Sequence, residues 1–226
     1  MKGSKDTRGS MQSKIDGPYR APANGQAPTK LIVFLHGVGA NGDDLIGLAD
    51  PLAGLFPHVG FISPNAPEAY DMAPVGYQWF SLADRDPQVM LRGIQASEPI
   101  LSRFLDDQKE AHGLTDGDIA LVGFSQGTMM SLYHAPRRAG QLAAVVGFSG
   151  ALIGAETLKQ DTVSRPPVLL VHGEADPVVP FAAMAMAAGA LNIAGFDVQT
   201  LARPGLAHGI DPQGLEAAAK HLLAVL

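Results

Sequence analysis

Ser125 is the residue whose surroundings most clearly suggest chemistry, because it lies at the centre of a Gly-x-Ser-x-Gly pattern from Gly123 to Gly127. An apolar run at residues 119–122 precedes the pattern, and a stretch typical of a helix follows it. A serine between a strand and a helix occupies a sharp, strained turn that exposes its hydroxyl group. The pattern also occurs by chance in glycine-rich chains, so its interpretation depends on whether the chain supplies the partners that a nucleophilic serine needs.

A serine hydroxyl is a weak nucleophile near neutral pH, so it needs a base, and the base needs an acid that orients it. In enzymes with this kind of serine turn, the acid and then the histidine follow along the chain, each in a loop after a strand. Asp176 follows the strand predicted at residues 167–171, and His208 follows the last predicted strand. The chain order therefore predicts a catalytic triad of Ser125, Asp176 and His208.

Other acids and histidines fit these roles less well. Glu174 comes earlier in the same turn, and Asp197 begins a strand, which would place it at the opposite edge of the sheet. Asp176 has an alternative role as the cap of the helix that follows it, and His208 has one as an ordinary exposed loop residue. His172, at a strand end, is expected to be structural. Surface positions on or beside helices are expected for the remaining histidines considered, His112, His134 and His221.

Two backbone N–H groups are needed to stabilise the negative oxygen that forms when a serine attacks a carbonyl group. The amide of Gln126 follows the nucleophile at the start of a helix and points toward that position. The second donor should come from the glycine-rich loop at residues 36–39 after an early strand, and we predict the amide of Val38. His36 is interpreted as a hydrogen-bonding residue beneath this loop rather than as a second base.

The same loop permits a different interpretation. Residues 37–42 read Gly-x-Gly-x-x-Gly between a predicted strand and a predicted helix, which is the pattern of dinucleotide-binding proteins. That pattern requires an acidic residue about 20 positions later, at the end of the second strand. The chain has Ser63-Pro64-Asn65 there, and its next acid is Glu68. A dinucleotide-binding oxidoreductase is therefore the less favoured alternative.

These residues require a parallel sheet whose strands end at one edge, and the hydrophobic pattern predicts one. Strands and helices alternate with few hairpin signals, which indicates an α/β protein with a mainly parallel, doubly wound sheet and helices on both faces. A long loop at residues 68–87 is expected over the top of the sheet, and no large lid domain is expected. The predicted strands are residues 31–35, 59–62, 119–122, 143–148, 167–171 and 197–201. The predicted helices are residues 43–55, 88–112, 181–194 and 211–226, besides the helix after Ser125.

Composition limits the classes of protein. At 226 residues and 46% hydrophobic content, the chain suits one domain with a sizeable core. A net charge of −6 argues against a general nucleic-acid or acidic-membrane binder. The absence of cysteine excludes disulfides and cysteine-based metal sites.

The N-terminal residues show no apolar signal segment, and no stretch of the chain reaches about 18 apolar residues. We therefore expect a soluble cytoplasmic protein. Residues 1–29 are polar and lack periodicity. We interpret them as a flexible tail or a remnant of cloning before a catalytic domain at residues 30–226.

Five stretches together resemble the phospholipase/carboxylesterase family of α/β-hydrolases, which includes bacterial carboxylesterases and acyl-protein thioesterases. The stretches are Phe-Leu-His-Gly-Val-Gly at 34–39, Gly-Tyr-Gln-Trp-Phe at 76–80, Gly-Phe-Ser-Gln-Gly at 123–127, His-Gly-Glu-Ala-Asp-Pro-Val-Val-Pro at 172–180 and His-Gly-Ile at 208–210. The resemblance implies the α/β-hydrolase fold, the triad and the oxyanion donors named above, and no metal or organic cofactor. One position departs from the pattern, since many thioesterase-like members carry Asp after Trp-Phe, where this chain has Ser81.

The combined pattern predicts a serine carboxylesterase that hydrolyses short to medium acyl esters through an acyl-enzyme. Trp79, Phe80 and Leu206 are predicted to line the substrate pocket, with core packing as an equal alternative for the two aromatic residues. Acyl-protein thioesterase or lysophospholipase activity on the same site is the nearest alternative, which Ser81 makes less favoured. A non-catalytic binding protein with this fold is an alternative from a different functional class. The expected partner is a small-molecule ester, with no nucleic acid and no integral membrane association, and a homodimer is left open.

Overall fold

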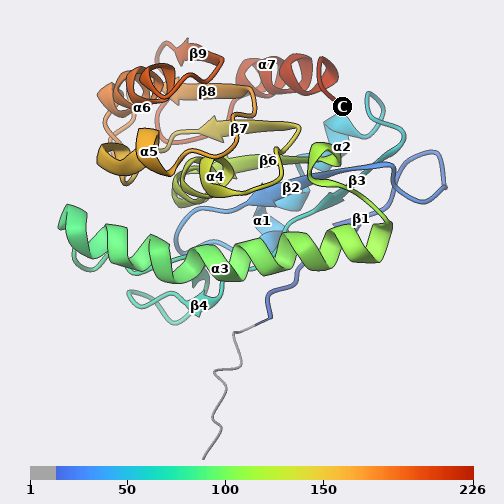
Figure 1. Cartoon of the computed structure of the whole chain (residues 1–226), viewed down its shortest axis with the longest axis horizontal. Coiled ribbons are helices and arrows are strands. Elements are labelled where there is room, and N and C mark those ends of the chain that lie inside the picture. The colour runs from blue at the N-terminus through green and yellow to red at the C-terminus, as the bar shows by residue number, and fades with distance from the viewer. Residues whose placement is uncertain (1–13) are drawn as a thin grey trace, which may run out of the picture.

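A seven-stranded sheet forms the centre of the molecule (Figure 1). The computed structural model describes residues 14–226. Six strands run parallel in the order β3-β2-β6-β7-β8-β9, and β1 pairs antiparallel with β3 at one edge. The mainly parallel sheet predicted from the alternation of elements is confirmed. The strands are β1 (Tyr19–Arg20), β2 (Lys30–Leu35), β3 (Val59–Ile62), β6 (Ile119–Phe124), β7 (Ala144–Phe148), β8 (Val168–Gly173) and β9 (Val198–Arg203).

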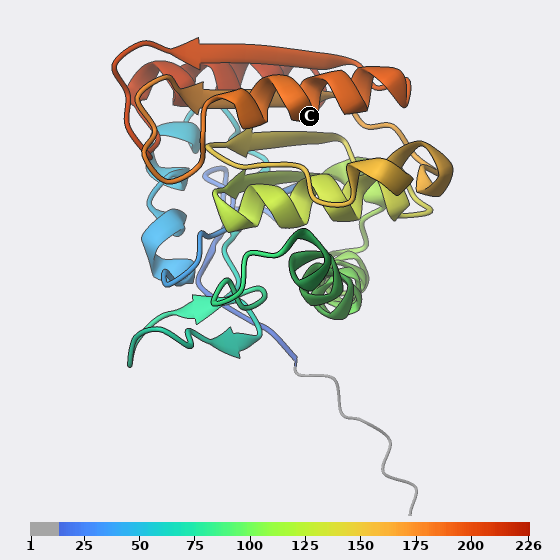
Figure 2. The same cartoon turned by 90° about the vertical axis from the view of Figure 1, so that its left-hand side faces the viewer.

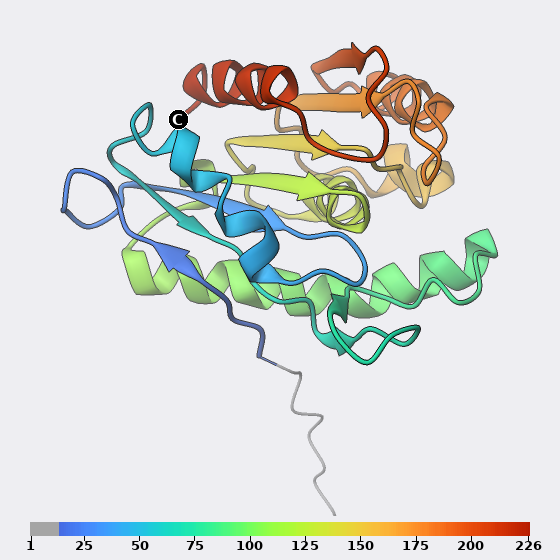
Figure 3. The same cartoon turned by 180° about the vertical axis from the view of Figure 1, so that it is seen from behind.

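Helices cover both faces of this sheet, as a doubly wound arrangement requires (Figure 2, Figure 3). The helices α1, α2 and α7 pack on one face, and α3, α4, α5 and α6 pack on the other. No helix in residues 14–226 combines the length and the apolar character needed to cross a membrane. The helices are α1 (Gly42–Ile46), α2 (Ala49–Leu52), α3 (Pro87–His112), α4 (Gln126–Arg137), α5 (Ala155–Asp161), α6 (Ala182–Ile193) and α7 (Pro212–Leu223), with a 3₁₀ turn at Asp116–Asp118.

Alternate residues of the central strands enter two separate hydrophobic cores. In β2, Leu31, Val33 and Leu35 belong to the core beneath α3 and α4, whereas Ile32 and Phe34 belong to the core beneath α1, α2 and α7. This division follows from the alternation of strand side chains between the two faces of a sheet. Because helices cover both faces, all five residues are fully buried, which explains the continuous apolar run.

The fold begins earlier in the chain than the predicted boundary at residue 29. Ile15 is buried, and β1 pairs with β3 through the register Tyr19↔Ile62. The Pro18 carbonyl also accepts a hydrogen bond from Ser63 N–H at 3.0 Å. The prediction of a flexible tail is therefore wrong for residues 14–29, because a two-residue strand is too short to produce a periodic sequence signal. The rest of the predicted tail lies outside the described residues.

The segment between β3 and α3 contains a small antiparallel hairpin that the sequence pattern did not indicate. It pairs β4 (Glu68–Ala69) with β5 (Tyr77–Gln78). The Tyr77 carbonyl accepts from Gly39 N–H at 2.8 Å, and Tyr77 N–H donates to the Ala40 carbonyl at 2.8 Å. The hairpin therefore fixes the loop that follows β2, at the carboxyl edge of the sheet.

Candidate active site

Ser125 lies in a strained turn between β6 and α4. Its backbone angles are φ 53° and ψ −114°, and Ser149 is the other non-glycine residue with positive φ in residues 14–226. Such a conformation costs about 1–3 kcal/mol and persists only where the surrounding structure enforces it. A Cβ on Gly123 would lie 2.5 Å from the Gly127 carbonyl oxygen, and one on Gly127 would overlap the Leu35 carbonyl. The two glycines are therefore required by the close approach of β2, β6 and α4.

Hydrogen bonds to neighbouring elements hold the turn in place. Ser125 N–H donates to the Phe148 carbonyl of β7 at 2.9 Å, and Met129 N–H donates to the Ser125 carbonyl at 3.2 Å. The Thr128 hydroxyl lies 2.8 Å from the carbonyl oxygens of both Gly123 and Phe148. These contacts come from the sheet and from the first turn of α4, so they supply the external constraint that the strained backbone needs.

Asp176 and His208 form a direct pair at the carboxyl ends of β8 and β9. His208 Nδ1 lies 2.7 Å from Asp176 Oδ2, and Asp176 Oδ1 accepts from Val178 N–H at 2.8 Å and Val179 N–H at 2.9 Å. Burial of the Asp176 carboxyl opposes its ionisation, but hydrogen bonds from His208, Val179 and Val178 outweigh burial and lower its pKa. The ionised carboxylate favours the tautomer with Nδ1–H, which leaves Nε2 of His208 as an acceptor.

The imidazole of His208 lies beside the residue that precedes Ser125. The rings of His208 and Phe124 have centroids 4.9 Å apart. Within residues 14–226, the structure contains no hydrogen bond between the Ser125 hydroxyl and His208. The three predicted triad residues thus lie at the same edge of the sheet, with the acid and base in direct contact and the serine adjacent through Phe124.

The competing acids and histidines occupy other places. Glu174 is exposed, and Asp197 lies beside the amino end of β9, at the opposite edge from Ser125. The expectation of surface positions is wrong for His134 and His221, which are 0% and 8% exposed, because α4 and α7 turn these side chains toward the protein interior. His112 is partly exposed at the end of α3, as expected.

The two predicted oxyanion donors belong to segments that meet at Ser125. Gln126 is the first residue of α4, where backbone N–H groups have no partner within the helix. A Cβ on Gly37, the neighbour of Val38, would lie 3.2 Å from the Ser125 Cβ and 3.2 Å from the Phe124 ring. The loop that carries Val38 therefore packs directly against the serine turn.

His36 supports this loop from below, in agreement with the sequence interpretation. Its Nε2 accepts from Ala66 N–H at 2.9 Å, and its Nδ1–H donates to the Gly37 carbonyl at 2.7 Å. The His36 carbonyl accepts from the Trp79 indole N–H at 3.0 Å. Burial lowers the pKa of His36, so the ring stays neutral and acts as a fixed hydrogen-bonding bridge.

The glycines of the dinucleotide-like pattern are explained by contacts within the chain itself. A Cβ on Gly39 would lie 3.2 Å from the Tyr70 ring, and one on Gly42 would overlap the Ser63 carbonyl. The first N–H groups of α1 are also occupied, because Gly42 N–H donates to Asn65 and Asp44 N–H donates to Asn41. This arrangement leaves a pyrophosphate few free donors, in contrast to a nucleotide-binding helix start.

Trp79 and Phe80 lie in the core, which was the equal alternative to a place in the substrate pocket. They are 0% and 1% exposed and belong to the hydrophobic core on the α3 and α4 face. The Gln126 side chain holds their backbone, since Oε1 accepts from Trp79 N–H at 2.8 Å and Nε2 donates to the Phe80 carbonyl at 2.6 Å. Leu206 is partly exposed, and its carbonyl accepts from Ala175 N–H at 3.0 Å, in the turn that carries Asp176.

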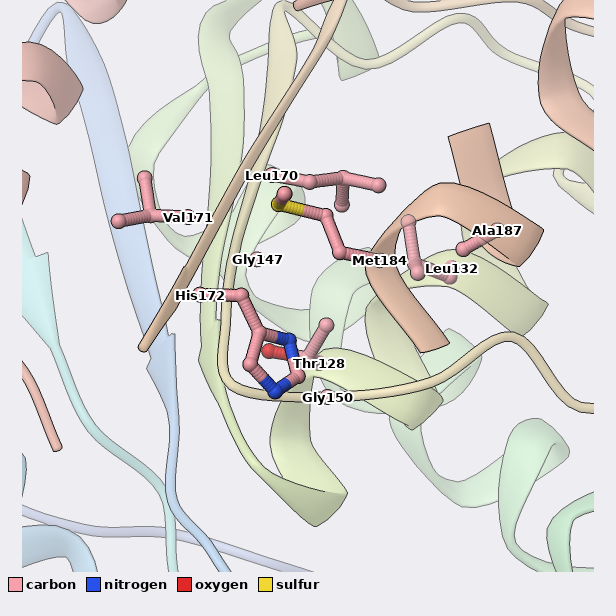
Figure 4. Close-up of a pocket in the computed structure, with 9 residues that line it drawn as sticks. All are labelled: Thr128, Leu132, Gly147, Gly150, Leu170, Val171, His172, Met184 and Ala187. Atoms are coloured by element: carbon pink, nitrogen blue, oxygen red, sulfur yellow. The ribbon is translucent and has the colours of Figure 1, made fainter. Parts of the chain in front are cut away.

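His172 makes a contact with the acid that sequence reasoning did not foresee. The ring is 2% exposed, and its Nε2 lies 3.0 Å from the Val179 carbonyl and 3.3 Å from Asp176 Oδ2. It borders a cavity of only about 10 Å³, between β8 and the helices α4 and α6 (Figure 4). That cavity is too small for a substrate, so His172 acts through the turn that holds Asp176.

Two apolar hollows flank the serine turn on opposite faces of the sheet, and neither was predicted. The α1 groove has a volume of about 330 Å³ and is lined by Gly37, Ala40, Asp44, Leu45, Leu48, Phe124 and Ile210. The α6 pocket has a volume of about 130 Å³ and is lined by Ala151, Leu152, Ala155, Ala183, Met186 and Ala187. Each combines segments distant in the chain, which is why local patterns did not indicate them.

The phospholipase/carboxylesterase family matches residues 21–226, nearly the whole chain. The chain belongs to this family. Esterase YpfH of Escherichia coli K12 is 29% identical over 201 residues, which cover 87% of this chain and 85% of the relative. An acyl-protein thioesterase 1 of Kluyveromyces lactis is 31% identical over 173 residues, which cover 71% of this chain and 75% of the relative.

Solved structures agree with this assignment. The crystal structure of esterase PE8 superposes with a TM-score of 0.90 at 38% identity, over 94% of this chain and all of the other. Zea mays acyl-protein thioesterase 2 gives a TM-score of 0.75 at 28% identity, over 92% of this chain and 97% of the other. The predicted resemblance and the α/β-hydrolase fold are thus confirmed, and the chain is a carboxylic ester hydrolase.

Proposed function

We propose that this hydrolase is a serine carboxylesterase that cleaves short to medium acyl esters through an acyl-enzyme on Ser125. The observation that carries the proposal is the 2.7 Å pair of His208 and Asp176 beside the strained turn of Ser125. An oriented imidazole next to a serine hydroxyl is the arrangement that makes serine nucleophilic.

In the first step, Ser125 Oγ attacks the ester carbonyl carbon while His208 Nε2 takes the hydroxyl proton. Asp176 stabilises the imidazolium, and the N–H groups of Val38 and Gln126 donate to the negative oxygen. The bond from carbon to the alcohol oxygen then breaks, and His208 gives its proton to the departing alkoxide. In the second step, water gives a proton to His208 while its oxygen attacks the acyl-enzyme carbonyl carbon. The bond from that carbon to Ser125 Oγ then breaks, His208 gives its proton to Ser125 Oγ, and the acid leaves.

The size of the α6 pocket supports a short or medium acyl group. Its lining is apolar, its volume is about 130 Å³, and Ala151 adjoins Gly150, where a Cβ would lie 2.9 Å from the Ser125 carbonyl oxygen. Acyl-protein thioesterase or lysophospholipase activity on the same site is the second candidate. It is supported by the names of two relatives and by the Ser81 hydroxyl, which hydrogen-bonds to Asp71 and so places a carboxylate next to position 81.

The decisive test is the reactivity of Ser125. A fluorophosphonate should label the wild-type protein at Ser125, and Ser125→Ala should abolish labelling and nearly all ester hydrolysis while the thermal unfolding temperature is retained. Ser102→Ala, in α3 and distant from the turn, serves as the matched control with unchanged turnover. Ester hydrolysis retained by Ser125→Ala would refute the mechanism.

A further inference from the structure

The α1 groove is an apolar surface that the packing of the fold leaves open. Leu48, Phe124 and Ile210 line it and remain partly exposed to solvent. Exposed apolar surface that is concave and adjoins a reactive residue is typical of a ligand-binding groove. Its volume of about 330 Å³ is within the usual range for such sites.

The groove shares its wall with the residues that would handle the leaving group. The Phe124 ring lines the groove and also lies against the His208 imidazole. Ile210, another residue of the lining, follows His208 by two positions. Gly37, on the other wall, approaches the Ser125 Cβ. The groove therefore extends away from the point where the serine and the imidazole face a substrate.

Protonation of the leaving alcohol determines which part of an ester lies in this groove. The alcohol oxygen must come within hydrogen-bonding distance of His208 to receive the proton. The rest of the alcohol then extends along the nearest open wall, which is formed by Phe124 and Ile210. The α6 pocket, on the opposite face of the sheet, is left for the acyl group.

The charge at the groove indicates the chemistry of that alcohol. Asp44 is the polar side chain of the lining, and its carboxylate accepts from Asn41 N–H at 2.9 Å in the cap of α1. An anionic alcohol, such as one carrying a phosphate, would be repelled by this carboxylate and by a chain of net charge −6. An uncharged apolar alcohol is complementary to the rest of the lining, which apart from Asp44 is apolar.

We propose that the α1 groove binds the alcohol portion of the ester and selects uncharged, apolar alcohols such as a benzyl group. This inference rests on the proposed role of Ser125. It assigns specificity to Leu48, Phe124 and Ile210, on the face of the sheet opposite to the α6 pocket.

Two ester series separate the groove from the acyl pocket. The first keeps an acetyl group and changes the alcohol from methyl to benzyl, and the second keeps methanol and extends the acyl group from acetyl to hexanoyl. Wild-type kcat/KM should rise along the alcohol series. Leu48→Trp, which fills the groove, should lower kcat/KM for benzyl acetate by about tenfold or more, a typical loss when apolar groups no longer fit a pocket. The same variant should lower kcat/KM for methyl acetate and methyl hexanoate much less than for benzyl acetate, because a methyl group does not reach along the groove.

A matched control and a second variant keep the test decisive. Ile193→Trp adds the same side chain at an exposed position at the end of α6 and should change neither series. Ala40→Leu fills the groove from its other wall, so it replaces Leu48→Trp if that variant fails to fold. Since all acetates form the same acyl-enzyme, deacylation should proceed at one rate for every alcohol.

The outcomes distinguish this inference from the proposed function. If Leu48→Trp is still labelled at Ser125 and still prefers benzyl acetate as the wild-type protein does, the groove assignment is refuted. The esterase mechanism would then still stand. If Leu48→Trp instead lowered kcat/KM for the longer acyl groups, the groove would be the acyl site. That result would also refute the assignment. Absence of labelling in the wild-type protein would refute the mechanism itself.

Discussion

His172 is a buried residue that contacts the carboxylate of Asp176. Four contacts fix the Asp176 carboxylate, from Val178, Val179, His208 and His172. The His172 contact at 3.3 Å is the longest, and the same nitrogen also lies 3.0 Å from the Val179 carbonyl. His172 thus ties both ends of the turn that places the acid, which makes it a positioning residue.

We predict that His172→Leu lowers kcat for ester hydrolysis by about tenfold, which corresponds to about 1.4 kcal/mol. Leucine lacks the N–H donor of His172, so the turn that carries Asp176 loses its hydrogen bond to β8. Asp176 then orients the His208 ring less accurately. His172→Gln keeps an N–H donor and should recover part of the loss. Steady-state kinetics measure the effect, with His112→Leu on α3 as the control. A lower unfolding temperature with wild-type kcat in His172→Leu would show a purely structural role.

The residues of the site were predictable to the extent that chain order constrains them. Ser125, Asp176 and His208 each follow a strand, and parallel strands bring their carboxyl ends to one edge. The choice between pocket and core stayed open for Trp79 and Phe80, because an aromatic residue in an irregular segment gives no sign of which way it points. Gln126, whose side chain binds their backbone, is separated from them by more than 40 positions.

At the scale of elements, Gln126 links the start of α4 to the segment after β5. Its side chain is fully buried and bonds to Trp79 N–H and the Phe80 carbonyl. We predict that Gln126→Leu destabilises the protein, because each buried backbone group left unpaired costs about 1–3 kcal/mol. The backbone N–H of residue 126 remains, so fluorophosphonate labelling of Ser125 should persist.

Urea denaturation measures the change in the free energy of unfolding. Gln199→Leu, at an exposed position of β9, makes the same change of side chain without breaking a buried contact and should have little effect. Equal stability of the two variants would show that water or a rearranged loop satisfies the groups that Gln126 holds.

Long elements were predictable and short ones were not. The 26-residue α3 and the apolar central strands show clear periodicity. In contrast, α5 has seven residues with Leu158 as its one buried member, and the strands of the β4–β5 hairpin have two residues each. The predicted helix at residues 43–55 is divided into α1 and α2. Periods of two or 3.6 residues need several repeats before they can be recognised.

At the scale of the whole molecule, the alternation of strands and helices was sufficient to predict the architecture. The α1 groove was not predictable, because it combines the loop after β2, the end of β6 and the loop before α7. Such a surface exists only after three distant segments pack together. Specificity is therefore harder to derive from one sequence than the candidate catalytic residues, whose order along the chain is itself informative.

Ion pairs, several of them partly buried, connect distant parts of the fold and should make its stability depend on pH. Arg138 contacts Asp106 and Asp116, and Lys30 of β2 lies 2.9 Å from Asp118. Burial opposes ionisation of Asp118, but hydrogen bonds from Thr115 and Lys30 outweigh burial and lower its pKa to about 2. The basic partners likewise lower the pKa values of Asp106 and Asp116 against the effect of burial.

We predict that the free energy of unfolding falls as pH decreases from about 4 toward 2. An unfolded aspartate has a pKa of about 3.9. The folded state therefore binds fewer protons than the unfolded state in this range, and acid favours unfolding. Asp118 alone should contribute about 1 kcal/mol, because partial exposure weakens the pair. Asp118→Asn should reduce the pH dependence measured by urea denaturation, whereas Glu110→Gln, an exposed site on α3, should retain it. Identical slopes for Asp118→Asn and the wild-type protein would show that the Lys30 pair does not couple folding to pH.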